Sequence, residues 1–214
     1  GKAQGDALAY VEQIGKDLPT GYRAVLGGSS VAFRESMGQL VFALILGIVV
    51  AYMVLASQFN SFMHPITVLS ILPLSIAGAA FALLVTGKTL NIFSMIGLLL
   101  LLGIAKKNSI ILVDYAVQGQ RERGLSAHDA MLKAGPVRLR PILMTTMATM
   151  CAAIPPALAL GPGAETRGPM AVAIIGGLVI STALSLLVVP AFFVVADQLK
   201  TKLASLFHRE EVEE

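Results

Sequence analysis

The sequence predicts an all-α membrane protein, and two observations support this prediction. First, 56% of the residues are hydrophobic and only 14% are charged, whereas about a quarter of the residues are charged in an ordinary soluble domain. Second, the chain contains apolar runs of about 20 residues, which is the length that crosses a bilayer as a helix. The alternating strands that a membrane β-barrel needs are not seen in the sequence. Helices are therefore expected, because they bond their backbone groups internally.

Five membrane spans are expected, and together with their loops they define a transmembrane domain over residues 36–198 and a tail over residues 199–214. Small residues at 77–80 and 176–177 are expected to permit close helix packing. Pro73, inside the second span, predicts a local interruption of that helix. The expected spans cover residues 36–57, 65–86, 91–116, 141–160 and 170–196.

The N-terminal region, residues 1–35, has a different pattern. Residues 6–17 predict a short amphipathic helix capped by Asp6. Residues 22–26 predict a strand, and a helix is expected to restart after Ser30 and to continue into the first span. One helix and one strand cannot bury a core by themselves. We therefore expect residues 1–35 to be the incomplete end of a larger soluble domain with a short α/β character.

The basic residues predict the orientation of the chain, since lysine and arginine concentrate in cytoplasmic loops. The expected loop 117–140 carries five of them, and the tail carries three more. With an odd number of spans, the C-terminus is then cytoplasmic and residues 1–35 lie outside. Within the loop, Ser126 and Asp129 resemble a capping box and Gly135-Pro136 a helix stop. A short surface helix is expected between them.

The composition also argues against several classes of function. The three histidines are scattered singly and Cys151 is the one cysteine, so no metal site and no cofactor site is expected. The net charge of +3 is too small and dispersed to indicate a nucleic-acid partner. No pair of nucleophile and base is visible, so we do not expect an enzyme.

Two lysines lie unusually deep in the third span. Residues 92–105 extend only about 21 Å as a helix, against a hydrocarbon core of about 30 Å. To cross, the helix must continue through Lys106 and Lys107 to about residue 111. The alternative is that both lysines mark the end of the span and extend to the headgroups. A charge at the centre of a span costs about 2.5–3.5 kcal/mol, which requires a partner or a water-filled cavity.

Helical geometry separates the two lysines. Gly103, Lys107 and Asp114 share one stripe of the helix, with Asn108 and Tyr115 beside it. We therefore assign Lys107 to the interior of the bundle.

Lys106 is assigned to another face, about 100° away, where it extends to the headgroups or meets a neighbouring helix. Asp114 is nearly two turns from Lys107, about 10 Å along the axis, which is too far for a direct ion pair. We expect the counter-charge of Lys107 to lie on a segment outside this chain.

The fourth span carries a second polar set. We expect a helix to start at Pro141, with Arg138 and Arg140 just before it. Arg138, Thr145 and Thr149 follow one line of this helix, which would suit a proton or water path from the cytoplasm. The alternative is that each threonine bonds only the carbonyl of its own helix.

Several segments, in order, resemble one family over essentially the whole chain. These are "GIAKKNSIILVDYA" (103–116), "RLRPILMTT" (138–146) and "GGLVISTALSLLVVPAFFV" (176–194). They are similar to the resistance-nodulation-division (RND) superfamily, and specifically to its hydrophobe/amphiphile efflux branch. The resemblance implies a five-helix C-terminal part of a twelve-helix transporter bundle. It also implies that residues 1–35 end a periplasmic porter domain.

The resemblance also implies roles for residues. It places a protonation-sensing lysine at Lys107, an arginine at the cytoplasmic end of the eleventh helix at Arg138, and a relay threonine at Thr145. In the family, the lysine pairs with two aspartates of the fourth helix, which this chain does not contain. Asn108, Asp114 and Lys106 are secondary candidates, and the family pattern assigns no role to Lys106.

The implied function is efflux of hydrophobic or amphiphilic compounds, such as drugs, detergents and dyes, by proton antiport. The implied setting is the inner membrane of a Gram-negative envelope. The implied partners are the rest of the same pump, two further copies in a homotrimer, a periplasmic adaptor and an outer-membrane channel. The chain alone is expected to be inactive.

Two alternatives remain at this point. Relatives within the superfamily include a protein-export auxiliary and proteins that handle sterols or lipids. The chain could also be a non-transporting membrane scaffold, in which Lys107 belongs to a purely structural ion pair.

Overall fold

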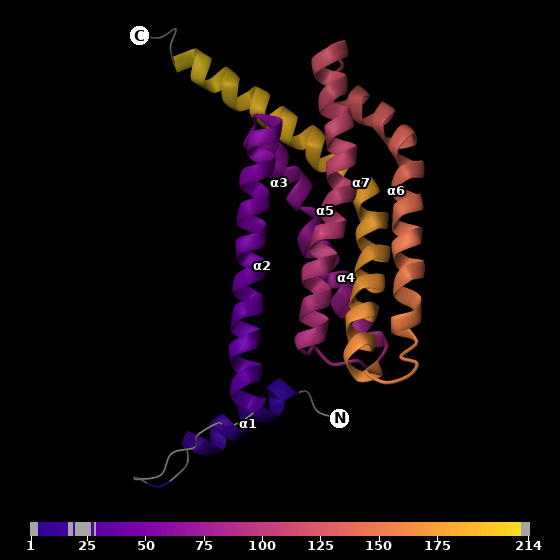
Figure 1. Cartoon of the computed structure of the whole chain (residues 1–214). Helices are drawn as coiled ribbons and strands as arrows, with labels where there is room; N and C mark the ends of the chain where they lie inside the picture. Colours follow the sequence, from indigo (N-terminus) through magenta and orange to yellow (C-terminus); the bar gives the residue numbers. More distant parts are fainter. Residues whose placement is uncertain (1–3, 17–18, 20–26, 28, 211–214) are drawn as a thin grey trace.

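The computed structural model describes residues 4–16, 19, 27 and 29–210, and the secondary structure of these residues is helical. The expected strand at 22–26 lies outside the described residues. Figure 1 shows long, nearly parallel helices with α1 at one end. The helices are α1 (Gln4–Lys16), α2 (Ser29–Phe59), α3 (Met63–Leu69), α4 (Ile71–Val85), α5 (Ile92–Arg123), α6 (Ala127–Ala157) and α7 (Ala164–Glu210).

The described residues contain five segments that are long and apolar enough to cross a membrane. This confirms the predicted fold class and the existence of each predicted span. The chain is therefore an all-α, multi-pass membrane protein. The segments are Phe33–Phe59, Met63–Val85, Ile92–Arg123, Ala127–Ala157 and Ala164–Leu199.

The second span is interrupted at Ser70, between α3 and α4. Pro73 lies three residues further on and has no N–H to donate to the carbonyl of Leu69, and its ring conflicts with that carbonyl. The Ser70 hydroxyl donates to the carbonyl of Thr67 at 2.8 Å. The interruption predicted from Pro73 is confirmed, and it lies on the N-terminal side of the proline as the steric conflict requires.

Helix α5 begins at a reciprocal cap. The Asn91 side chain accepts a hydrogen bond from the Ser94 N–H at 2.8 Å, and the Ser94 hydroxyl accepts one from the Asn91 N–H at 2.7 Å. The helix ends at Gly124, whose φ of 60° is the left-handed conformation that favours glycine. Its 32 residues extend about 48 Å, so it passes without interruption through Lys106 and Lys107.

Helix α6 differs from the prediction. The N-cap is confirmed, since Ser126 accepts a hydrogen bond from the Asp129 N–H at 3.1 Å. However, the helix continues through Gly135-Pro136 and through Pro141 to Ala157. Three predictions are therefore wrong: the helix stop at Gly135-Pro136, the separate surface helix, and the helix start at Pro141. Only residues 124–126 connect α5 to α6.

Packing explains why α6 continues. Its first turns are already buried, because Ala130, Met131 and Ala134 belong to a core cluster that also contains Val117 of α5 and Phe193 of α7. A proline in a helix costs about 3 kcal/mol, and burial of apolar residues on both sides of Pro136 offsets that cost. Gly135 has no positive φ, which a glycine stop would need.

Helix α7 lies at the centre and packs against α4, α5 and α6. Small residues allow these close approaches. A Cβ atom at Gly176 would lie 2.0 Å from the Cβ of Ala82, and one at Gly177 would lie 2.1 Å from the Leu101 side chain. The prediction that the small residues at 77–80 and 176–177 serve helix packing is confirmed for Gly78 as well, which faces Ile180 and Gly176.

Helix α2 stands at the edge of the bundle (Figure 1). Only 6% of its most apolar window is buried, so most of its surface is left for lipid or for another protein segment. One stripe packs against the other helices, and it has the three-to-four-residue spacing of a helix face. The stripe includes Met37, Leu40, Leu44, Ile48, Leu55 and Phe59.

Helix α1 begins at Gln4, two residues before Asp6. The predicted cap at Asp6 is therefore wrong, although the helix itself is confirmed. Val11 and Ile14 are exposed. The carboxylate of Glu12 accepts a hydrogen bond from Arg34 of α2 at 2.7 Å, an exposed ion pair between α1 and the first turns of α2.

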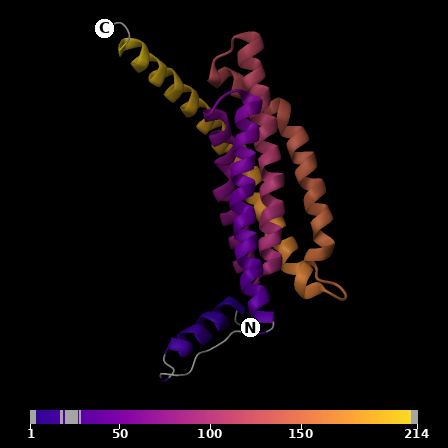
Figure 2. The same ribbon diagram turned by 60° about the vertical axis from the view of Figure 1, so that its left-hand side comes forward.

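The two ends of the bundle differ. Figures 1 and 2 show α1 at one end, and the α5–α6 connection together with the C-terminal part of α7 at the other. The second end carries Arg121, Arg123 and Lys133.

Candidate functional site

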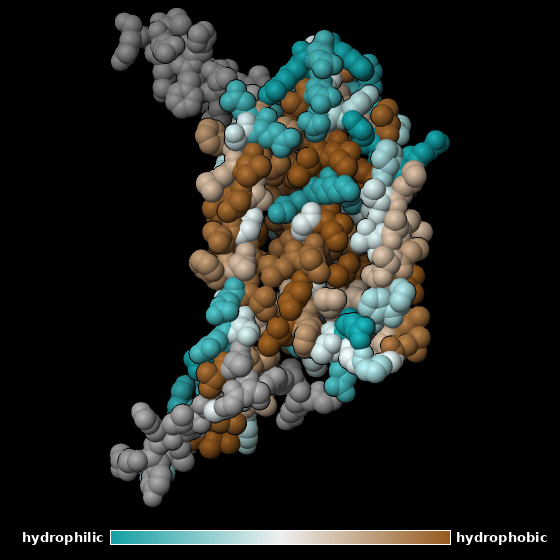
Figure 3. Space-filling model, viewed as in Figure 1, coloured by the Kyte–Doolittle hydropathy of each residue, from teal (hydrophilic) through white to brown (hydrophobic). Residues whose placement is uncertain are grey.

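The middle of α5 carries the lysines that the sequence analysis selected. Lys107 is exposed and Lys106 is half-buried. Lys107 lies 15 residues after the start of the helix and 16 before its end, so it is near the middle of α5. Figure 3 shows hydrophilic surface at mid-height within an otherwise hydrophobic face. The described helices do not cover Lys107, and it forms no ion pair with any described residue.

The predicted stripe around Lys107 lies on this uncovered side. Gly103 is exposed and Asp114 is half-buried. Asp114 accepts a hydrogen bond from the Gln118 side chain at 3.3 Å, one turn further along the same helix. The Asp114 carboxylate therefore bonds within its own helix, and it does not contact Lys107.

Asn108 points the other way, into the bundle. Its side-chain amide donates to the hydroxyl of Thr146 on α6 at 3.2 Å and to that of Thr182 on α7 at 3.4 Å. The two hydroxyls lie 3.3 Å from each other. All three residues are buried, with exposed fractions of 3%, 3% and 6%. We call these three residues the polar triad.

The polar triad lies on the packed face of α5, together with buried apolar residues such as Leu101 and Leu112. Successive residues of a helix are about 100° apart. With Asn108 on the packed face, its neighbour Lys107 lies on the exposed side of the helix. Apolar packing and the hydrogen bonds of Asn108 thus agree on the rotation that leaves Lys107 uncovered.

Sequence reasoning named Asn108 only as a secondary candidate and missed Thr146 and Thr182. One signal was available, since an amide deep in an apolar span needs hydrogen-bonding partners. The hydroxyl groups of other spans are the natural partners in a membrane. Which threonines supply these hydroxyl groups depends on how the helices are rotated relative to one another. The hydrophobic periodicity of the sequence does not reveal that rotation.

Arg138 joins α6 to α5 near the basic end. Its guanidinium carbon lies 4.8 Å from the centroid of the Tyr115 ring, which is cation–π geometry. The Arg138 Nε atom is buried and has no hydrogen-bond partner among the described residues. Arg138 is half-buried, so its charge lies at the edge of the packed region.

Thr145 and Thr149 bond within their own helix. The Thr145 hydroxyl donates to the carbonyls of Pro141 and Ile142, each at 3.1 Å. The Thr149 hydroxyl donates to the carbonyl of Thr145 at 2.8 Å. These are the local bonds that the alternative interpretation expected. Thr145 is half-buried and adjoins Thr146 of the polar triad.

Comparison with protein families gives the wider context. The model of the AcrB/AcrD/AcrF family matches residues 1–197. The chain belongs to this family. The matched range contains the polar triad and each of the predicted site residues, and it includes α1 to α6 and most of α7. Membership of the AcrB/AcrD/AcrF family confirms the resemblance to RND proteins and makes this chain part of an RND-type transporter.

Proposed function

We propose that this AcrB/AcrD/AcrF-family chain is the C-terminal part of a proton-driven efflux pump for hydrophobic or amphiphilic compounds. Residues 36–198 are its transmembrane domain, residues 1–35 the end of a periplasmic porter domain, and residues 199–214 a cytoplasmic tail. Family membership and the five apolar spans support this proposal. The role is transport and not enzymatic catalysis.

The observation that carries the proposal is the position of Lys107. A cation at the centre of a span costs about 2.5–3.5 kcal/mol unless it is paired or hydrated. Lys107 is exposed on a face that the described helices leave open. A carboxylate on another segment of the pump would offset this cost. The paired aspartates of the first half of RND pumps are the group that we propose for this place.

Protonation of those carboxylates would drive the pump. When they are ionised, they attract Lys107; when they are protonated, the attraction is lost and α5 is free to move. Each entering proton releases about 2.3 kcal/mol per 100 mV of membrane potential and about 1.4 kcal/mol per pH unit. This energy is enough to break several of the weak hydrogen bonds that hold membrane helices together.

Arg138 and Thr145 would guide the proton on its way to the cytoplasm. Arg138 is half-buried against Tyr115, so it can hold a positive potential near the cytoplasmic end of the path. Thr145 would have to exchange its bonds to the Pro141 and Ile142 carbonyls for a bond to water or to Lys107. The Thr145 hydroxyl is a suitable relay because it both donates and accepts hydrogen bonds.

Helix α2 would couple the membrane domain to the porter domain. Arg34 joins its first turns to Glu12 at 2.7 Å. At the other end, the Arg121 guanidinium donates to the Phe59 carbonyl at 2.7 Å. Between these two attachments, most of the helix surface is not packed. A motion of the basic end of α5 would thus be transmitted along α2, a single rigid helix of 31 residues.

The basic end of the bundle would be cytoplasmic by the positive-inside rule. We propose that the chain resides in the inner membrane of a Gram-negative cell, with residues 1–35 periplasmic. A homotrimer with a periplasmic adaptor and an outer-membrane channel would complete the exporter.

Drug export in cells that make the complete pump tests the proposal. Lys107→Ala should abolish export, and Lys106→Ala is the matched control because the neighbouring lysine loses the same atoms. Membrane levels of each variant are measured by immunoblot. A Lys107→Ala pump with near wild-type export would refute the assignment, as would equal losses in both variants.

A further inference from the structure

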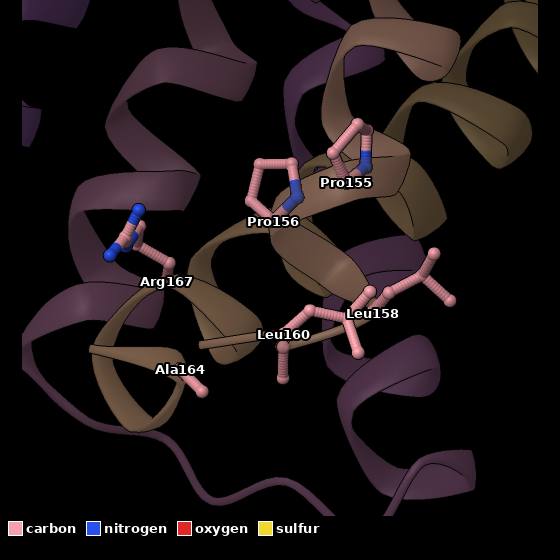
Figure 4. A pocket seen from close by; sticks show the side chains of 7 residues that line it. Pro155, Pro156, Leu158, Leu160, Ala164 and Arg167 are labelled. Atoms are coloured by element: carbon pink, nitrogen blue, oxygen red, sulfur yellow. The ribbon is translucent and has the colours of Figure 1, made fainter. Parts of the chain in front are cut away.

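A pocket lies where α6 ends and α7 begins, away from the polar triad. Its volume is about 340 Å³, within the range of about 300–1,000 Å³ that is typical of ligand pockets. Figure 4 shows Arg167 and Ala164 on one side of it and the prolines and leucines on the other. The lining residues are Pro155, Pro156, Leu158, Ala159, Leu160, Ala164 and Arg167.

Arg167 is the one charged residue of this lining, and it is exposed. The guanidinium Nη2 donates to the carbonyl of Pro162 in the same loop. A guanidinium has five N–H donors, so this bond leaves the others for a ligand. Arg167 forms no ion pair with a described residue, although the carboxylate of Glu165 is only two residues away.

A second cation comes to the same place from another loop. The Lys88 ammonium lies 3.6 Å from the position that a Cβ atom would take at Gly168, the residue after Arg167. Lys88 follows α4 and is half-buried, and it too forms no ion pair with a described residue. Arg167 on the wall of the cavity and Lys88 near it come from separate elements, and neither forms an ion pair with a described residue.

We propose that this pocket binds an anionic phospholipid. The phosphate accepts hydrogen bonds from Arg167, with Lys88 beside it, since guanidinium and phosphate match in charge and geometry. The first methylene groups of the acyl chain lie along the proline and leucine wall.

A lipid fits this pocket better than a soluble anion because of its surroundings. Leu158 and Leu160 are exposed by 61% and 80%, at the C-terminal end of α6 and in the connection to α7. An inorganic anion would leave these leucines uncovered, whereas an acyl chain covers them. The anionic headgroup would be held by charge pairing with Arg167 while the acyl chain covers the exposed leucines.

Photo-crosslinking tests the proposal directly. The full 214-residue chain is reconstituted in phosphatidylcholine vesicles that contain a small fraction of phosphatidylglycerol with a photoreactive group near the glycerol. After irradiation, peptides that cover residues 155–168 are analysed for lipid adducts. Parallel vesicles contain phosphatidylcholine with the same photoreactive group.

We expect adducts from the phosphatidylglycerol probe at 155–168 in the wild type. Arg167→Gln, which removes the charge and keeps a polar side chain, should reduce their yield about fivefold, as expected for one cation beside an anionic lipid. Lys88→Gln should reduce it similarly. Arg123→Gln, at the opposite end of the bundle, is the matched control and should leave it unchanged.

Adducts at residues 117–140 in the same samples show that each variant is inserted in the bilayer, and circular dichroism shows that each keeps its helix content. Equal yields from wild type, Arg167→Gln and Lys88→Gln would overturn the proposal. Equal labelling by the phosphatidylcholine probe would also overturn it, because charge would then not be what the pocket recognises.

Discussion

The side-chain amide of Asn108 lies 3.2 Å from the Thr146 hydroxyl, and this bond joins the centre of α5 to α6. The same amide reaches Thr182 of α7, so three helices meet at one buried polar point. The arrangement turns Asn108 inward and its neighbour Lys107 outward. The orientation of the proposed proton-sensing lysine therefore follows from the packing of this helix face, to which the hydrogen bonds of Asn108 contribute.

Thr182→Val should destabilise the chain, because it removes a buried hydroxyl of the polar triad while it keeps the shape of the side chain. The expected loss in the free energy of unfolding is about 0.5–1.5 kcal/mol, the usual worth of a hydrogen bond between membrane helices. Thr149→Val is the matched control, since the Thr149 hydroxyl bonds only within α6. Denaturant titration in mixed micelles measures the free energy of unfolding of both variants. Equal values for Thr182→Val and Thr149→Val would contradict a role for the triad in packing.

Gly176→Ala should destabilise the contact between α4 and α7. Its new Cβ atom would lie 2.0 Å from the Cβ of Ala82, so the two helices must move apart. Overpacking of this kind costs about 1–3 kcal/mol. Gly47→Ala on α2 meets nothing within 4 Å and should be neutral or stabilising by up to about 1 kcal/mol. Thermal unfolding in detergent compares the two variants, and a Gly176→Ala protein as stable as Gly47→Ala would refute the packing.

Arg121→Gln should loosen the end of α2. The Arg121 guanidinium donates to the Phe59 carbonyl at 2.7 Å, and this contact satisfies one of the unpaired carbonyls at the C-terminus of that helix. We expect faster hydrogen–deuterium exchange over residues 56–62, by a factor that corresponds to about 1 kcal/mol. Arg123→Gln is the control, as Arg123 is exposed and two residues further on. Unchanged exchange in Arg121→Gln would show that the contact does not hold α2.

The membrane spans and the continuation of α5 through Lys107 could be predicted from the sequence because both follow from length. A helix must cross about 30 Å of hydrocarbon, and residues 92–105 are too few to do so. The turn before Asn91 excluded extension in the other direction. The structure accordingly continues α5 through both lysines to Arg123.

The course of α6 could not be predicted in the same way. Gly135-Pro136 is a sound local signal for the end of a helix. However, a proline inside a helix costs only about 3 kcal/mol, and burial of the flanking residues can offset that cost. Ala134 is fully buried against the neighbouring helices. The partners of Asn108 were missed for a related reason, since the rotation of three helices relative to one another decides which hydroxyl groups meet.

The central claim is that another segment of the pump covers the face of α5 that carries Lys107. A nitroxide spin label on Lys107→Cys, in a background with Cys151→Ser, measures this cover by electron paramagnetic resonance. The label should be mobile and accessible to oxygen in the 214-residue chain alone. In the complete transporter it should be immobilised and protected from oxygen. A label that stays mobile and oxygen-accessible in the complete transporter would contradict the account.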